Sequence, residues 1–188
     1  YHKNDMEEAR KINFRNNRNI YIFYGLSRSG NHPIINWFLK NSGIKNKQFY
    51  NNLIKEEISN ERFKKFVEEN NYSENIVISL ENKNEDYLSE EQIKKLFHVD
   101  PKKIKKIFII RDPYNWVSSL LELRKKMKEY KYFNEIKPKV MGFLDVFKNY
   151  IEFSSKKGNY QIIYNKWFLS KDYRDNIAND FGFKNNDN

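Results

Sequence analysis

Four short apolar runs, separated by longer segments with helical periodicity, constrain the fold of this 188-residue chain most strongly. The runs are residues 20–24, 75–80, 107–110 and 160–164, and each has the length of a buried strand. Strands that alternate with amphipathic helices are typical of a parallel sheet covered by helices on both faces. We therefore expect an α/β fold with a parallel sheet between two layers of helices.

The intervening segments carry helix start signals and apolar residues at helical spacing. Ser89 with Gln92 is a capping box, and Asp112 before Pro113 caps a long helix that we expect to reach about Lys128. Two other expected helices begin near Pro33 and after residue 60. Apolar residues at helical spacing indicate two more, within residues 144–151 and 173–181.

The sequence indicates one folded domain. Residues 1–18 are polar and predict a loose N-terminal arm, and residues 19–188 contain no linker rich in Gly, Pro or Ser.

No apolar stretch approaches the ~20 residues of a membrane helix, so we expect no membrane span. The chain has no Cys, which excludes disulfides and thiolate chemistry and favours a reducing, cytoplasmic location.

The formal charge of +10 could attract nucleic acid, anionic lipid or an anionic substrate. The lysines are scattered along the chain, which is more typical of a solvated surface than of a binding patch. No base-reading motif accompanies them, so we expect no nucleic-acid partner. The three His residues are too dispersed to predict a metal site.

A glycine loop follows the first apolar run and precedes the helix near Pro33. Gly25 and Gly30 let backbone N–H groups approach an anion, and the helix directs its positive end toward the same place. Nucleotide hydrolases with such a loop need Lys and then Ser or Thr after the second glycine, where this chain has Asn31 and His32. The loop is therefore suited to a phosphate but poorly suited to Mg·ATP. The alternative is a strand-to-helix turn that binds nothing.

A second motif lies about eighty residues further on, after the third apolar run. Arg111 leaves the carboxyl end of that expected strand, and Ser119 lies about two turns into the next helix. A guanidinium and a hydroxyl placed in this way can converge on one phosphate, which Arg can bind through two parallel hydrogen bonds. A surface Arg–Asp pair beside an ordinary helical Ser is the alternative.

Together the two motifs resemble those of sulfotransferases that use 3′-phosphoadenosine-5′-phosphosulfate (PAPS), which have a P-loop-type fold. That family has a Lys/Arg-Ser-Gly-Thr-Thr loop around the 5′-phosphosulfate, and an Arg followed eight residues later by a Ser at the 3′-phosphate. Asn31 and His32 depart from the usual Thr pair. Seven residues match the two motifs, and the resemblance implies that they contact the cofactor. They are Arg28, Ser29, Gly30, Asn31, His32, Arg111 and Ser119.

The resemblance implies transfer of a sulfuryl group from PAPS to a hydroxyl or amine, with adenosine 3′,5′-bisphosphate as the product. Arg28 is the cation that we expect at the leaving phosphate, since Arg stays protonated. Family members commonly carry the general base just after the second strand, where this chain has Glu81. His98 is the rival, although it follows a helix end, where a cationic His is commonly structural.

The acceptor cannot be derived from the sequence, and carbohydrate, lipid, peptide and phenol are all candidates. Two other function classes remain open. A nucleotide kinase or other ATP-binding protein of P-loop type predicts Mg²⁺-dependent ATP binding. A non-enzymatic basic domain predicts salt-dependent binding of DNA or RNA.

Overall fold

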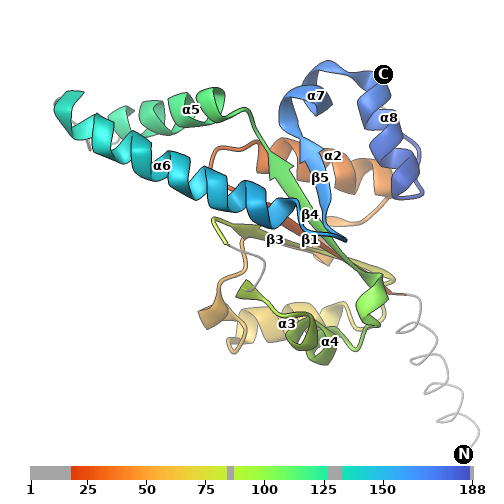
Figure 1. Ribbon diagram of the computed structural model, residues 1–188. Coiled ribbons are helices and arrows are strands. Elements are labelled where there is room, and N and C mark those ends of the chain that lie inside the picture. Colours follow the sequence, from red (N-terminus) through yellow and green to blue (C-terminus); the bar gives the residue numbers. More distant parts are fainter. Residues whose placement is uncertain (1–17, 84–86, 127–132, 187–188) are drawn as a thin grey trace, which may run out of the picture.

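The computed structural model describes residues 18–83, 87–126 and 133–186. The predicted N-terminal arm lies outside these residues, apart from Arg18. Five parallel strands form one sheet with the order β2-β3-β1-β4-β5 (Figure 1). Their bounds are β1 (Asn19–Gly25), β2 (Phe49–Tyr50), β3 (Asn75–Glu81), β4 (Ile104–Ile110) and β5 (Tyr160–Ile163). The expected α/β fold with a parallel sheet is confirmed.

Helices cover both faces of the sheet and complete three layers. One face carries α2 (Asn31–Ser42), α7 (Tyr164–Leu169) and α8 (Lys171–Asp180). The other carries α3 (Glu61–Glu69), α4 (Glu90–Phe97), α5 (Pro113–Lys126) and α6 (Phe133–Ser154). Within the described part of the chain, none of the helices has both the length and the apolar character needed to cross a bilayer.

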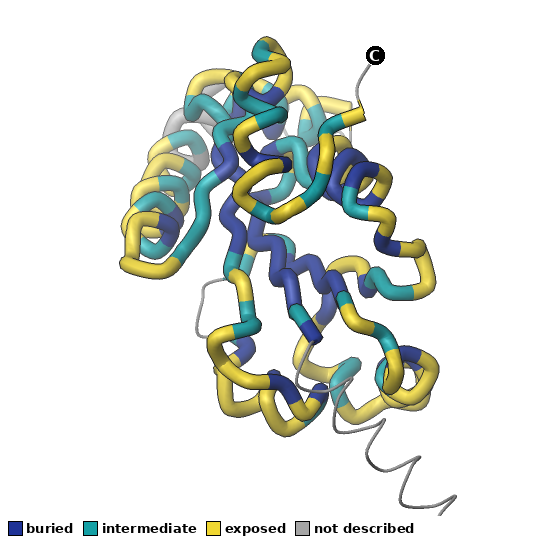
Figure 2. Tube along the Cα trace, turned by 90° about the vertical axis from the view of Figure 1, so that its right-hand side faces the viewer, coloured by how far each residue is buried: buried dark blue, intermediate teal, exposed yellow. Residues whose placement is uncertain are grey.

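The apolar strand residues form two hydrophobic cores, one on each face of the sheet. Ile20, Ile22 and Tyr24 of β1 pack toward α3 to α6, whereas Tyr21 and Phe23 pack toward α2, α7 and α8. This split follows from the alternation of side chains along a strand. Because both faces are covered, the strands are almost continuously buried, as Figure 2 shows along the centre of the molecule.

The predicted caps form the expected hydrogen bonds. The Ser89 hydroxyl accepts from the Gln92 amide at 3.2 Å, and the Gln92 side chain accepts from the Ser89 amide at 2.9 Å. Asp112 accepts from the amide of Asn115 at 3.0 Å, at the start of α5. These polar contacts satisfy backbone N–H groups that have no partner inside a helix.

Three features differ from the sequence-based expectation, and the predicted helix end near Lys128 lies outside the described residues. The two-residue strand β2 and the helix α7 were not expected, and the last strand ends at Ile163, so that Tyr164 belongs to α7. Ile163 pairs with Ile110, the last residue of β4, and no strand residue lies opposite Tyr164. The chain therefore turns into a helix at that point.

Arg18 is buried at the amino end of the sheet, just before β1. Its guanidinium donates to the carbonyls of Ser73 at 3.0 Å and Phe97 at 2.7 Å, and also to those of Asn70 and Asn71. The side chain thereby ties the ends of α3 and α4 to the start of the central strand.

Tyr150 of α6 makes a comparable link at the carboxyl end of the sheet. Its hydroxyl donates to the carbonyls of Tyr24 at 2.9 Å and Ile109 at 3.1 Å, on the neighbouring strands β1 and β4. Burial raises the pKa of Tyr150 well above its ordinary value, because the phenolate would be desolvated. The neutral hydroxyl therefore fixes the spacing of two strands directly beneath the loops that follow them.

We expect Tyr150→Phe to lower the free energy of unfolding by about 1–2 kcal/mol at neutral pH, because it removes a buried hydrogen-bond donor. The pKa of Tyr150 is higher in the folded state than in the unfolded state, where it is about 10. The stabilisation by the neutral hydroxyl is therefore lost as the pH rises above about 10. The difference between the two proteins in urea unfolding should therefore shrink at alkaline pH. Tyr114→Phe is the control, since Tyr114 is 83% exposed. A constant difference across pH would contradict the role given to Tyr150.

Candidate functional site

The carboxyl ends of the three central strands lie side by side. Gly25, the last residue of β1, is paired with Glu81 at the end of β3 and with Ile109 near the end of β4. Three segments therefore emerge at one edge of the sheet: the glycine loop, the residues around Glu81, and Arg111. Ligands of open α/β sheets bind at this edge.

The glycine loop begins with a tight turn from Leu26 to Ser29. The Ser29 amide donates to the Leu26 carbonyl at 3.0 Å, and Arg28, the third residue of the turn, has a φ of 69°. A turn with positive φ at this place usually contains Gly or Asn, because a β-carbon makes the conformation unfavourable. Arg28 is therefore in a strained conformation that other contacts must maintain.

Three hydrogen bonds from distant segments hold that turn. The Ser27 amide donates to the Asn82 side chain at 2.7 Å, and the Trp116 indole donates to the Ser27 carbonyl at 2.7 Å. One terminal nitrogen of Arg111 (Nη1) donates to the Arg28 carbonyl at 2.8 Å. The backbone around Arg28 is thus fixed from the β3 side, from α5 and from the end of β4.

Gly30 follows the turn and allows α7 to pack against it. Its φ is 93°, and a β-carbon there would lie 2.1 Å from the ring of Tyr164. The same ring lies beneath the Arg111 guanidinium, whose central carbon is 5.2 Å from the ring centre. Tyr164 therefore positions both motifs, through the glycine contact and through a cation–π interaction.

Asn31 begins α2 and connects the loop to Glu81. Its side-chain oxygen accepts from the Ser29 hydroxyl at 2.6 Å, and its side-chain nitrogen donates to the Leu26 carbonyl at 3.2 Å. The same nitrogen lies 3.4 Å from a carboxylate oxygen of Glu81. Asn31 thus performs a structural role inside the loop, with its amide oriented by these partners.

The first turn of α2 contributes backbone donors to the site. Gly30 is the N-cap and provides no side-chain cap. The amides of the first helical residues, Asn31 and His32, have no carbonyl partner within the helix, as expected at a helix start. Together with the helix dipole, they favour an anion at this position.

A cleft of about 390 Å³ lies in front of these donors. Arg28 is exposed, Arg111 is half-buried, and neither forms an ion pair with a residue that the structure describes. The Nε atom of Arg111 is buried and, among the described residues, has no hydrogen-bond partner. The cleft is lined by Ser27, Arg28, Gly30, Asn31, His32, Pro33, Glu81 and Arg111.

Ser119 is not among the residues that line the cleft, but it contacts one of them, and its partner differs from the one expected. The Nε atom of Arg28 donates to its hydroxyl at 3.2 Å, whereas Arg111 is directed to the Arg28 carbonyl. The expected convergence of Arg111 and Ser119 is therefore mediated by Arg28.

The two candidate bases lie at opposite ends of the sheet. Glu81 lines the cleft, close to Asn31, and is the last residue of β3, not the first residue after it as predicted. His98 caps the end of α4, next to Phe97, whose carbonyl accepts from Arg18 just before β1. The structure thus brings Glu81, and not His98, together with Arg28 and Arg111.

Sequence reasoning missed Asn82, Trp116 and Tyr164 as parts of this site. Asn82 has a φ of 55° and bonds to the loop twice, through its side chain and through its amide to the Gly25 carbonyl at 2.9 Å. An Asn directly after a strand was the available signal, because Asn tolerates positive φ. The indole and phenol rings carried no such signal, since buried aromatic residues are usual in a core.

Comparison of the sequence with models of known protein families and with curated proteins finds no match to either.

We expect Gly30→Ala to be more destabilising than Gly158→Ala. Both glycines have a φ near 93°, so both variants incur the cost of a β-carbon in this conformation, about 1–2 kcal/mol. A β-carbon at Gly158 meets nothing within 4 Å, whereas at Gly30 it meets the Tyr164 ring. The clash should cost roughly 1–3 kcal/mol more in chemical denaturation. When Tyr164 is also replaced by Ala, Gly30→Ala should cost no more than Gly158→Ala. If the extra cost at Gly30 persists without the ring, the ring contact is not its cause.

Proposed function

We propose that this protein is a PAPS-dependent sulfotransferase. The observation that carries the proposal is the meeting of two motifs that are about eighty residues apart. Arg111 and Arg28 line the same cleft, where Arg111 donates to the Arg28 carbonyl at 2.8 Å, and Arg28 donates to the adjacent Ser119 at 3.2 Å. Two cations, a hydroxyl and a helix start in one place suit a ligand with more than one phosphate group.

The residues present fit such a donor substrate. The amides of Gly30, Asn31 and His32, together with Arg28, would bind its 5′-phosphosulfate. Arg111 and Ser119 would bind its 3′-phosphate, and the unpartnered Nε of Arg111 would gain an acceptor there. The bond between Arg28 and Ser119 would then be exchanged for bonds of each group to a phosphate oxygen.

Bound PAPS would supply a sulfuryl group that is already activated by its bond to phosphate. The acceptor oxygen forms a bond to sulfur while the bond from sulfur to the phosphate oxygen breaks, and the phosphate keeps the electron pair. In this scheme Glu81 takes the proton of the acceptor hydroxyl, and Arg28 stabilises the charge that develops on the leaving phosphate. Glu81 is half-buried beside the loop, where its carboxylate is held by Asn31.

We expect Ser119→Ala to distinguish the two ends of the nucleotide. It removes one hydrogen bond to a charged group at the 3′-phosphate and leaves the contact between Arg111 and the loop in place. In calorimetric titration it should weaken adenosine 3′,5′-bisphosphate by about 10-fold and leave adenosine 5′-phosphate unchanged. Arg111→Ala should weaken the bisphosphate further, and should affect the 5′-phosphate less.

Ser118→Ala is the matched control, since Ser118 is exposed on the same helix and makes no contact with Arg28. Equal weakening of both nucleotides by Ser119→Ala would exclude Ser119 from the 3′-phosphate site.

We expect Glu81→Gln to reduce sulfuryl transfer by ~10²–10⁴-fold while leaving the affinity for the bisphosphate nearly unchanged. Arg28→Ala should reduce the rate by ~10²–10³-fold and also weaken the nucleotide, because the cation contacts it in the ground state as well. Rates with PAPS and a set of hydroxyl acceptors measure both effects. His98→Ala should be fully active. An inactive His98→Ala beside an active Glu81→Gln would reverse the assignment of the base.

A further inference from the structure

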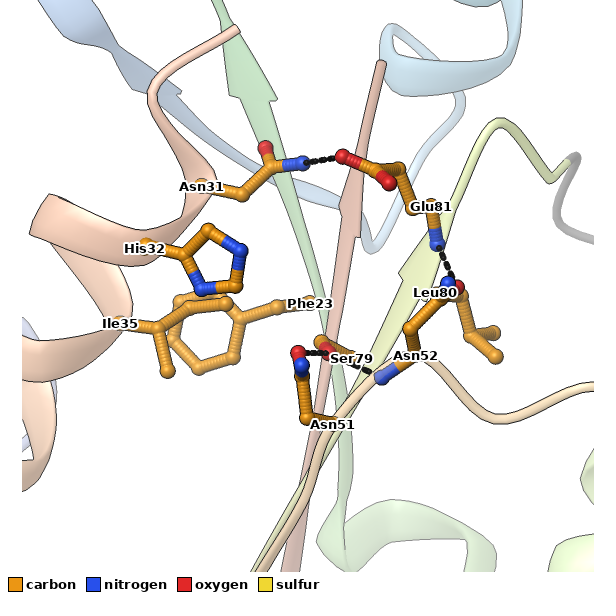
Figure 3. Close-up of a pocket in the computed structure, with 9 residues that line it drawn as sticks. All are labelled: Phe23, Asn31, His32, Ile35, Asn51, Asn52, Ser79, Leu80 and Glu81. Atoms are coloured by element: carbon orange, nitrogen blue, oxygen red, sulfur yellow. Dashed lines mark hydrogen bonds between the residues drawn. The ribbon is translucent and has the colours of Figure 1, made fainter. Parts of the chain in front are cut away.

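A second, smaller cavity of about 60 Å³ opens beside the cleft, at the carboxyl ends of β2 and β3. It shares three lining residues with the cleft, so the two spaces meet at Glu81 and at the start of α2. Figure 3 shows polar groups from α2, from β3 and from the segment after β2 around it. These polar residues are Asn31, His32, Asn51, Asn52, Ser79 and Glu81.

A network of hydrogen bonds fixes the orientation of the Asn51 side chain. The Ser79 hydroxyl donates to the Asn51 side-chain oxygen at 3.0 Å and accepts from the Asn52 amide at 2.7 Å. Because the oxygen of Asn51 is used in this way, its NH₂ group is the part left for a ligand. Among the described residues, no hydrogen bond from this NH₂ group is found.

The backbone around Asn52 is held in place by hydrogen bonds. Asn52 has a φ of 50°, which Asn tolerates, and its side chain accepts from the Glu81 amide at 3.2 Å. The Leu53 amide donates to the Ser79 carbonyl at 2.9 Å, which attaches the segment to β3 on the other side. These contacts fix the position of Asn51 and Asn52 at the cavity.

The size and chemistry of the cavity select a class of ligand. A water-sized group needs about 10–15 Å³ on this measure, so the cavity of about 60 Å³ admits roughly four to six such groups. That is enough for a hydroxymethyl group with a neighbouring hydroxyl, and too little for a whole phenol. Phe23 and Ile35 add apolar surface for C–H groups, beside the amide donors and the carboxylate acceptor.

We infer that this cavity binds the hydroxymethyl edge of a neutral carbohydrate acceptor and presents one of its hydroxyls to Glu81. The inference deepens the proposed function and rests on it for the direction of the reaction. Asn51 donates to a sugar oxygen, and Glu81 accepts from the hydroxyl that reacts. A phenolic acceptor has no oxygen besides the one that reacts, so it would lack the hydrogen bond that a second sugar oxygen makes with Asn51.

Asn51→Asp tests this assignment most sharply. The aspartate keeps the oxygen that accepts from Ser79 but replaces the NH₂ donors with a second acceptor. Asn51 is exposed, so the variant should fold normally. Asn71→Ala is the matched control, because Asn71 is exposed and lies near the opposite end of the sheet, where its carbonyl accepts from Arg18.

The measurement is saturation-transfer NMR with methyl hexosides and with phenol, in the presence of adenosine 3′,5′-bisphosphate, followed by sulfuryl transfer from PAPS. We expect hexosides to bind, phenol not to bind, and Asn51→Asp to weaken hexoside binding by at least about 5-fold with the bisphosphate unaffected. The Michaelis constant for the hexoside should rise by a similar factor.

Hexoside binding that is unchanged in Asn51→Asp, or phenol that binds better than any hexoside, would overturn the inference even if the bisphosphate binds. If hexosides bind in an Asn51-dependent manner but the bisphosphate does not bind, the sulfotransferase proposal fails and the carbohydrate site stands. If neither ligand binds, both are wrong.

Discussion

Parallel pairing of β1 with both β3 and β4 is the constraint on which the site depends. It aligns Gly25 with Glu81 and with Ile109, so the loops after three strands emerge at one edge of the sheet. Tyr150 maintains this alignment from below, through its hydrogen bonds to the carbonyls of Tyr24 and Ile109. Residues that are about fifty to eighty positions apart in the sequence can therefore share one cleft.

The loops are held in place by polar contacts between segments more than by packing within each segment. Among the described residues, non-glycine positions with positive φ are Arg28, Asn52, Asn82 and His98, and the first three lie at this edge of the sheet. Each of the three is held by hydrogen bonds to a neighbouring loop or strand. For Arg28, whose β-carbon makes this conformation unfavourable, such contacts maintain the strain. Preorganised donors need little rearrangement when they bind an anion.

The sequence predicts the long strands and the position of Glu81 because each depends on a local apolar pattern and on where it ends. It could not predict the two-residue strand β2, which carries no periodicity of its own. The contacts of Asn51 and Asn52 with β3 depend on that strand and were missed with it. The contact between Arg28 and Ser119 was missed for another reason, since it joins residues 91 positions apart and no local pattern predicts it.

The central claim is that the two motifs form one site for a nucleotide with phosphates at both its 3′ and 5′ ends. Calorimetric titration of the unmodified protein with adenosine 3′,5′-bisphosphate, and separately with ATP and Mg²⁺, tests it most directly. We expect the bisphosphate to bind more tightly than Mg·ATP, and a metal chelator to leave its affinity unchanged. Tighter binding of ATP that requires Mg²⁺, with no binding of the bisphosphate, would contradict it.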